Sequence, residues 1–171
     1  MAYIELSTYI DAPLELVFDL SRSIDFHMES TPGTNEVAIA GTTTGLIEMD
    51  ETVTWRATHL GFRQTLTSKI TGFRRPHYFA DEQHKGIFKW FRHEHFYERE
   101  GDGTRLKDIF EFESPGGTIG KWFNKIFLRG YMQRMLETRN QIMKEWAESD
   151  RWQSLPGMEH HLHNPSPALE H

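Results

Sequence analysis

Hydrophobic and polar residues alternate along most of the chain, and this pattern predicts a protein built mainly from β-strands. Strict alternation puts the apolar residues on one face of a strand and the polar residues on the other. Turn residues separate the alternating segments, which are residues 2–10, 35–41, 50–59, 62–73, 77–84, 88–99 and 104–114. Because no long connection interrupts the last six, we expect an antiparallel meander.

Helical patterns are confined to three segments. Two short helices are predicted after the first strand, at residues 13–20 with Asp11 as the N-cap and at residues 23–30 with Ser23 as the N-cap. A longer helix is predicted over residues 118–148, because apolar residues recur there near the helical period. The chain therefore predicts one sheet and one long helix packed against it.

The alternation also predicts which side chains of residues 88–99 face inward. One face carries Phe91, His93, His95 and Tyr97. A two-residue turn within Gly-Asp-Gly at 101–103 brings this face against the apolar face of the last strand. One choice of turn sets His95 opposite Asp108, and the other sets it opposite Phe110. Either way, both histidines are predicted to point into the interior.

The orientation of strand 77–84 depends on the loop after it. A three-residue loop at 85–87 would point Asp81 and Gln83 inward and set Asp81 opposite Phe91. A two-residue turn would point both side chains outward. We prefer the longer loop, because it leaves the intervening polar residues of the strand in solvent.

The predicted inner face carries more polar groups than an ordinary core. These groups belong to His59, Gln64, Ser68, Asp81, Gln83, His93, His95 and Asp108. An unpartnered buried polar group costs about 1–3 kcal/mol, so all of these need one another, water or a ligand. A wet or ligand-filled cavity between the sheet and the long helix explains them with one assumption.

Composition narrows the classes of function. The chain has 171 residues, the size of one domain, and its net charge of −6 argues against a nucleic-acid binder. It contains no cysteine, which excludes disulfides, zinc ribbons and thiol nucleophiles. No segment resembles a secretory signal or approaches the roughly 20 apolar residues of a membrane span. We therefore expect a soluble, cytoplasmic protein without a membrane span.

The sequence after the long helix has lost its periodicity. We expect a single domain over residues 1–148 and a flexible tail over residues 149–168, although Trp152 and Leu155 could dock on the body. The final residues 169–171 look like the stub of a purification tag. The tail also contains three histidines that could bind a stray metal ion, although we expect no such role: His160, His161 and His163.

The order of one strand, two short helices, six strands and one long helix resembles the START-like or SRPBCC superfamily. Within it, the ligand-binding proteins related to polyketide cyclases and dehydrases have a pattern of roughly F-x-D-x-Q-x-x-G-P-F, H-x-H, G-T-x-x-x-D and P-x-G. The matching residues are Phe79, Asp81, Gln83, Gly86, Phe88, His93, His95, Gly103, Thr104, Asp108, Pro115 and Gly117. Ile87 stands where the pattern has proline, which affects only the shape of the loop.

The resemblance extends over about residues 2–147. It implies an α+β helix-grip fold of the START/Bet v 1 type. In this fold a curved seven-stranded antiparallel sheet surrounds the long C-terminal helix, and a cavity lies between them. Since this superfamily includes binders, transfer proteins, cyclases and hydrolases, the resemblance specifies the fold more closely than the function.

The preferred hypothesis is a cavity that binds a small, mostly apolar molecule with a polar head. The predicted ligand-binding residues are Trp55, His59, Gln64, Asp81, Gln83, Phe91, His93, His95, Tyr97, Asp108 and Phe110. If the protein is an enzyme, His93, His95 and Asp108 are the candidate catalytic residues. Their acid–base chemistry would suit cyclisation or dehydration of a polyketide-like substrate.

Two alternatives remain open. Two histidines on one strand face with a carboxylate can bind a metal ion, but the resembled family is not a metalloprotein family, so we expect no metal and no other cofactor. The other alternative is a satisfied internal polar network in an interaction protein that works through its surface. We expect Trp122, Phe123 and Tyr131 to pack the long helix, although one face of this helix could line the cavity. For His27 we expect a surface role, although it could also lie at the mouth of the cavity.

Overall fold

The computed structural model describes residues 1–113 and 127–163, and its strands form one antiparallel sheet. The strands are β1 (Ala2–Ile10), β2 (Val37–Gly41), β3 (Thr52–His59), β4 (Phe62–Arg74), β5 (Tyr78–Lys85), β6 (Trp90–Glu100) and β7 (Gly103–Glu113). Their order across the sheet is β1-β7-β6-β5-β4-β3-β2, so the predicted meander of the last six strands is confirmed. β1 pairs with β7, so the first and last strands of the chain are neighbours in the sheet.

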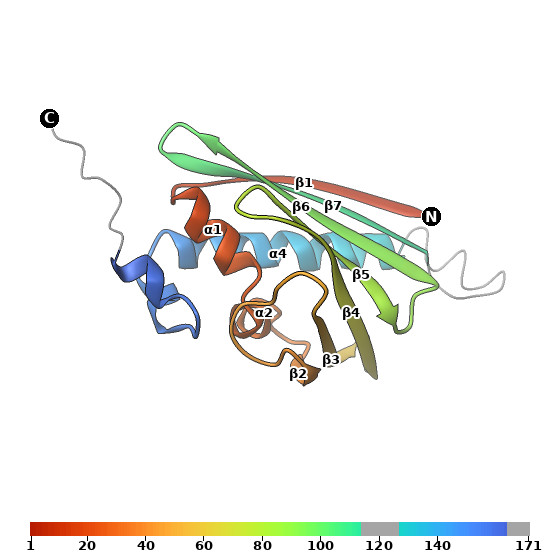
Figure 1. Ribbon diagram of the computed structural model, residues 1–171. Helices are drawn as coiled ribbons and strands as arrows, with labels where there is room; N and C mark the ends of the chain where they lie inside the picture. The colour runs from red at the N-terminus through yellow and green to blue at the C-terminus, as the bar shows by residue number, and fades with distance from the viewer. Residues whose placement is uncertain (114–126, 164–171) are drawn as a thin grey trace, which may run out of the picture.

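Helices line one side of this sheet. They are α1 (Leu14–Ser21), α2 (Ile24–Glu29), α4 (Arg129–Ala147) and two 3-10 helices, η2 (Arg151–Ser154) and η3 (Glu159–His163). Figure 1 shows α4 running along the strands, with α1 in front of it, and α1 contacts both α4 and β6. The long helix is confirmed from residue 129 onward, and residues 118–126 of the prediction lie outside the described residues.

The two predicted helix caps have different outcomes. The Ser23 hydroxyl accepts a hydrogen bond from the Phe26 amide, so the cap of α2 is confirmed. The prediction for Asp11 is wrong, because α1 begins after Pro13 with no side-chain cap. The Asp11 backbone N–H instead donates to the Glu148 carboxylate at the end of α4. This bond ties the start of α1 to the far end of the long helix.

The register between β6 and β7 sets the predicted histidines opposite the predicted aspartate. His95 lies directly across from Asp108, as the turn at residues 101–102 requires. His93 and His95 are 8% and 2% exposed, and Asp108 is 1% exposed. The prediction that both histidines face the interior is therefore confirmed.

The predicted pairing of β5 with β6 is wrong by two residues. Asp81 lies opposite His93 rather than opposite Phe91, because the connection is wider than three residues. The Gln83 side chain holds this wider loop, accepting from the Phe88 amide and donating to the Phe88 carbonyl. A shift of two residues preserves the face of each side chain, so Asp81 still points inward.

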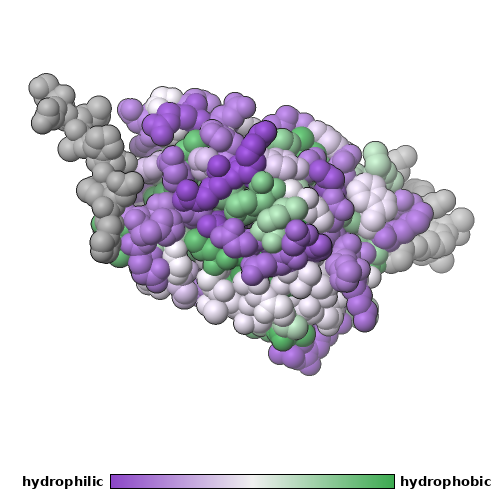
Figure 2. Space-filling view, viewed as in Figure 1, coloured by the Kyte–Doolittle hydropathy of each residue, from purple (hydrophilic) through white to green (hydrophobic). Residues whose placement is uncertain are grey.

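The core has two hydrophobic clusters, one on each side of the middle of α4. The larger one joins α1, α2 and the C-terminal residues to the sheet, with Phe18 at its centre in edge-on contact with Phe73, Phe79 and Tyr97. The smaller one gathers the phenylalanines of β6 and β7 against Met132 and Leu136. Hydrophilic and neutral residues cover most of the face drawn in Figure 2, with hydrophobic residues in small groups.

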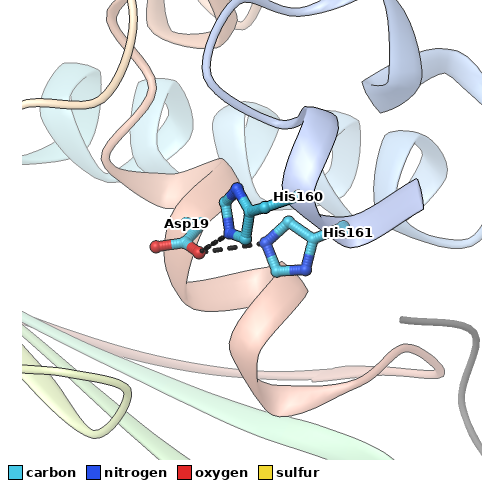
Figure 3. A group of neighbouring side chains, drawn as sticks. All are labelled: Asp19, His160 and His161. Atoms are coloured by element: carbon cyan, nitrogen blue, oxygen red, sulfur yellow. Dashed lines mark hydrogen bonds and ion pairs between the residues drawn. The ribbon is translucent and has the colours of Figure 1, made fainter. Parts of the chain in front are cut away.

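The chain after α4 folds back onto the body. Trp152, Leu155 and Met158 are buried in the larger core cluster. The imidazoles of His160 and His161 donate to one carboxylate oxygen of Asp19 on α1, at 3.0 and 2.9 Å (Figure 3). Trp152 and Leu155 therefore dock on the body, as the sequence allowed, whereas the flexibility of the tail stays a prediction. Residues 164–171 lie outside the described residues.

Candidate functional site

A cavity of about 190 Å³ lies between the sheet and α4. This is more than ten times the space of about 10–15 Å³ that a single buried water needs. Its walls are largely apolar and include Trp55, Leu66, Phe91, Phe110, Met132 and Leu136. The cavity that the sequence predicts between sheet and helix is therefore present.

Most of the predicted ligand-binding residues line this cavity. They are Trp55, His59, Gln64, Asp81, Phe91, His93, His95 and Phe110. The other three lie elsewhere, and the reasons differ. Gln83 holds the β5–β6 loop, Tyr97 packs on Phe18 in the core, and Asp108 lies behind His95. These three can act only through their neighbours.

His95 is held between two carboxylates. Its Nδ1 donates to Asp108 Oδ1 at 2.6 Å, and its Nε2 lies 3.6 Å from Asp81 Oδ1. Phe79 stacks on the imidazole with ring centroids 4.2 Å apart. The second oxygen of Asp108 accepts from Asn140 Nδ2 at 2.6 Å, so the long helix fixes the carboxylate that fixes the histidine.

These contacts favour the charged form of His95. Burial opposes the imidazolium, but the bonds to Asp108 and Asp81 outweigh it and raise the pKa of His95. Burial likewise opposes the ionised form of Asp108, yet the hydrogen bond from His95 and the nearby His93 ring hold its pKa well below the usual range. Both shifts favour an imidazolium facing a carboxylate.

His93 has the opposite shift although its ring lies only 3.9 Å from that of His95. Burial and the neighbouring charge of His95 lower the pKa of His93 to about 4, so the ring is neutral near pH 7. Its Nε2 lies 3.3 Å from Asp108 Oδ1, but the two are not aligned as a hydrogen bond, and the atom is buried without a partner in the described structure. In the cavity wall the two shifts thus leave His93 neutral and favour the charged form of His95.

Two polar residues of α4 belong to this site and were missing from the sequence prediction. Arg139 and Asn140 are 5% and 2% exposed, and Arg139 lines the cavity while donating to the Ser21 carbonyl. A signal was available, because Asn140 falls on the buried stripe between Leu136 and Met143 at helical spacing. A polar residue on such a stripe indicates a buried partner.

A second polar group lines the cavity at the β3–β4 hairpin. His59 Nδ1 and the Tyr131 hydroxyl of α4 are 2.8 Å apart, and His27 Nε2 lies 3.3 Å from Glu36 Oε2. The sequence predicted packing for Tyr131 and a surface role for His27, and both residues in fact line the cavity. His27 stacks on Trp55 with ring centroids 4.2 Å apart, a contact that only the fold brings about.

Two groups in the described structure have donor atoms near enough to hold a metal ion. In the group of Asp81, His93 and His95, Asp108 would orient the imidazole of His95, as a carboxylate does in many histidine–metal sites. In the group of Asp19, His160 and His161, the same carboxylate already binds two arginines, Arg22 and Arg75. Their positive charge opposes a cation there.

Comparisons with known proteins agree with this architecture. The model of the family described as polyketide cyclase / dehydrase and lipid transport matches residues 1–148. No curated protein matches the chain.

Several solved structures share the fold. A protein of Thermus thermophilus has a TM-score of 0.69 at 18% identity, over 84% of this chain and 95% of its own. The Zhui aromatase/cyclase of a Streptomyces species has a TM-score of 0.69 at 15% identity, over 86% and 93%. The major latex-like protein 151 of Panax ginseng has a TM-score of 0.62 at 12% identity, over 85% and 97%.

At these identities the likeness between structures concerns the helix-grip fold. The family match rests on the sequence itself, and it extends from β1 through the end of α4. Since that span contains the whole sheet, the long helix and the cavity between them, the chain belongs to the polyketide cyclase / dehydrase and lipid transport family.

Proposed function

We propose that the protein binds a small, mostly apolar molecule with a polar head in the cavity beneath α4. The observation that carries this proposal is His93 Nε2, which is buried without a hydrogen-bond partner in the wall of a largely apolar cavity. An unpartnered buried polar atom costs about 1–3 kcal/mol, and the polar head of a ligand could supply the missing partner.

Different residues of the cavity wall would contact the apolar body and the polar head of the ligand. Trp55, Phe91 and Phe110 offer aromatic surface to the body of the ligand. Asp81, His93 and His95 would contact its head, and Asp108 with Asn140 would keep the His95 ring in place. Because the sum of charges on Asp81, Asp108, His95 and Arg139 is near zero, a neutral head such as a carbonyl or hydroxyl fits best.

The opposite pKa shifts of the two histidines favour a second candidate, acid–base catalysis. A neutral and a charged imidazole side by side provide one base and one acid. In a β-hydroxy carbonyl compound, His93 could remove the proton α to the carbonyl while His95 protonates the departing hydroxyl. The C–H and C–O bonds would break, a C=C bond would form and water would leave.

The first test is native mass spectrometry of the purified protein, followed by denaturing extraction of any bound molecule. We expect a small molecule near one-to-one stoichiometry, and its loss in His93→Gln and Trp55→Ala but not in the exposed control His84→Gln. Stability measurements accompany each variant. If no ligand co-purifies and no apolar probe raises the melting temperature, the interaction-protein alternative gains support.

Catalysis has its own test. Incubation with a β-hydroxy ketone probe should release the unsaturated ketone, followed by its absorbance, in the unmodified protein and not in His93→Gln. Binding without turnover would leave a carrier and reject the enzyme.

The proposed partner is thus a small ligand rather than a nucleic acid, consistent with the acidic net charge of −6. No described helix is long and apolar enough to cross a membrane. We propose the cytoplasm as the location, because a chain with no cysteine needs no oxidising compartment.

A further inference from the structure

The cavity has two separate polar ends. One is the histidine–aspartate pole, formed by Asp81, His93 and His95. The other is the glutamate pole, formed by Glu36, His59, Gln64 and Tyr131. All of these residues line the same cavity.

The strand register places the two poles at different points along β4. Asp81 pairs with Ile70 on β4, and Gln64 lies six residues earlier on the same strand. Six residues of extended strand span about 20 Å at roughly 3.3 Å per residue, although the curvature of the sheet shortens the direct path. Between them the wall is largely apolar, with Trp55 and Leu66 paired across β3 and β4, and the buried Ser68 also lies in this stretch.

The glutamate pole is rich in hydrogen-bond acceptors. Glu36 is 8% exposed at its side chain, and attraction to His27 overcomes burial and lowers the pKa of Glu36, which is therefore ionised. Burial lowers the pKa of His59, so this ring stays neutral beside the carboxylate. The Gln64 carbonyl oxygen is buried with no partner in the described structure. The Glu36 carboxylate already contacts His27, whereas the buried Gln64 carbonyl oxygen at the same end still lacks a donor.

We propose that the cavity binds an elongated ligand with a polar group at each end. A carbonyl or hydroxyl oxygen occupies the histidine–aspartate pole, and a hydrogen-bond donor, a hydroxyl or an ammonium group, occupies the glutamate pole. The apolar middle of the ligand lies along Trp55 and Leu66. This inference rests on the proposed ligand-binding function and adds the chemical class of the ligand to it.

A matched ligand series tests this directly. Decanol, decanediol and aminodecanol share one chain and differ only at the second end. Their dissociation constants are measured by calorimetry on the unmodified protein, on Glu36→Gln and on Tyr131→Phe. We expect aminodecanol to bind the unmodified protein about tenfold or more tighter than decanol, the gain of one hydrogen bond to a charged group. Glu36→Gln should remove most of that gain.

Glu98→Gln is the matched control, because Glu98 is exposed beyond the buried part of β6. It should keep the full gain. If decanol binds but a second polar end adds nothing, or adds as much in Glu36→Gln as in the control, the two-pole inference is wrong and the proposed binding function stands. If no member of the series binds the unmodified protein, the inference and the binding proposal both fail.

Discussion

At the scale of single residues, Asp108 determines the chemistry of the cavity wall without touching the cavity. One of its oxygens binds His95 at 2.6 Å and the other binds Asn140 at 2.6 Å. A carboxylate in this position fixes the orientation of the imidazole and favours its charged form. Asp108 is accordingly a positioning residue, while His93 and His95 are the groups that could meet a ligand.

Removal of this carboxylate should change the titration of its partner. We expect Asp108→Asn to lower the pKa of His95, because burial, which opposes the imidazolium, then loses its strongest counterweight. The measurement is a proton-detected pH titration of the His95 ring by NMR. Asp102→Asn, in the exposed β6–β7 turn, should leave that titration where it is. An unchanged His95 in Asp108→Asn would contradict the assigned role.

His93 should make the protein less stable in mild acid. Its pKa is about 4 in the folded state and about 6.5 when unfolded, so the unfolded chain binds the extra proton between these values. The contribution of a neutral His93 is complete above pH 6.5 and falls as the pH drops toward 4, by about 2 kcal/mol at pH 5. His95 has the opposite sign, since its raised pKa stabilises the fold at low pH and that contribution is lost as the pH rises.

Urea unfolding at pH 7 and pH 5 checks this expectation. His93→Gln cannot titrate, so its loss of stability between the two pH values should be about 2 kcal/mol smaller than that of the unmodified protein. His84→Gln, at an exposed position of β5, should behave like the unmodified protein. Equal losses in all three proteins would show that His93 titrates normally.

At the scale of elements, the segment after α4 acts as part of the body. Trp152 is 9% exposed, and η2 contacts the end of α4. The two histidines of η3 reach Asp19 on α1, whose charge is also met by Arg22 and Arg75. These contacts join the last described residues to the first helix.

Removal of the Trp152 side chain, which packs this segment on the core, should destabilise the whole domain. We expect Trp152→Ala to lower the free energy of unfolding by about 3 kcal/mol, since it removes a large buried ring from the core. Chemical denaturation measures the change. The exposed neighbour Gln153→Ala should stay within about 0.5 kcal/mol of the unmodified protein. A similar small effect for Trp152→Ala would show that the segment is only loosely attached.

At the scale of the whole molecule, the cavity and the hydrophobic core share the space between the sheet and α4. The two hydrophobic clusters hold the sheet and α4 together at either side, so the cavity between them need not be filled for the fold to persist. Mutations in the cavity can therefore change the affinity for a ligand with little effect on the stability of the fold.

Filling the cavity should therefore weaken binding without unfolding the protein. Ala57 lines the cavity and is 4% exposed. We expect Ala57→Leu to reduce ligand affinity tenfold or more, because the larger side chain takes up space that the ligand needs. The melting temperature should stay equal or rise, because the new side chain fills a cavity. Thermal shift and calorimetry with the same probe measure both effects.

Thr65→Leu adds the same side chain on the exposed outer face of β4 and should change neither quantity. If Ala57→Leu binds as tightly as the unmodified protein, the ligand does not occupy this part of the cavity.

The sequence alone determined the strands, their faces and the inward direction of His93, His95 and Asp108, because a period of two leaves only two possible faces for each strand. The alternation of faces also predicted correctly that Asp81 points inward, although the predicted partner of Asp81 was wrong. A shift of two residues along a strand keeps each side chain on the same face. Local patterns and the family motif also led to the helix-grip fold before any contact was known.

Only the tertiary structure decided which polar groups meet. Asn140, Arg139 and Glu36 entered the site because α4 and the segment before β2 pack over the sheet, and no local pattern specifies such distant contacts. Gln83 does not line the cavity, because its side-chain amide is hydrogen-bonded to the Phe88 backbone. The segment after α4 packs on the body, because Trp152 is buried in the larger core cluster. Period and propensity act over a few residues, whereas the partners of a buried polar group are fixed by packing across the whole chain.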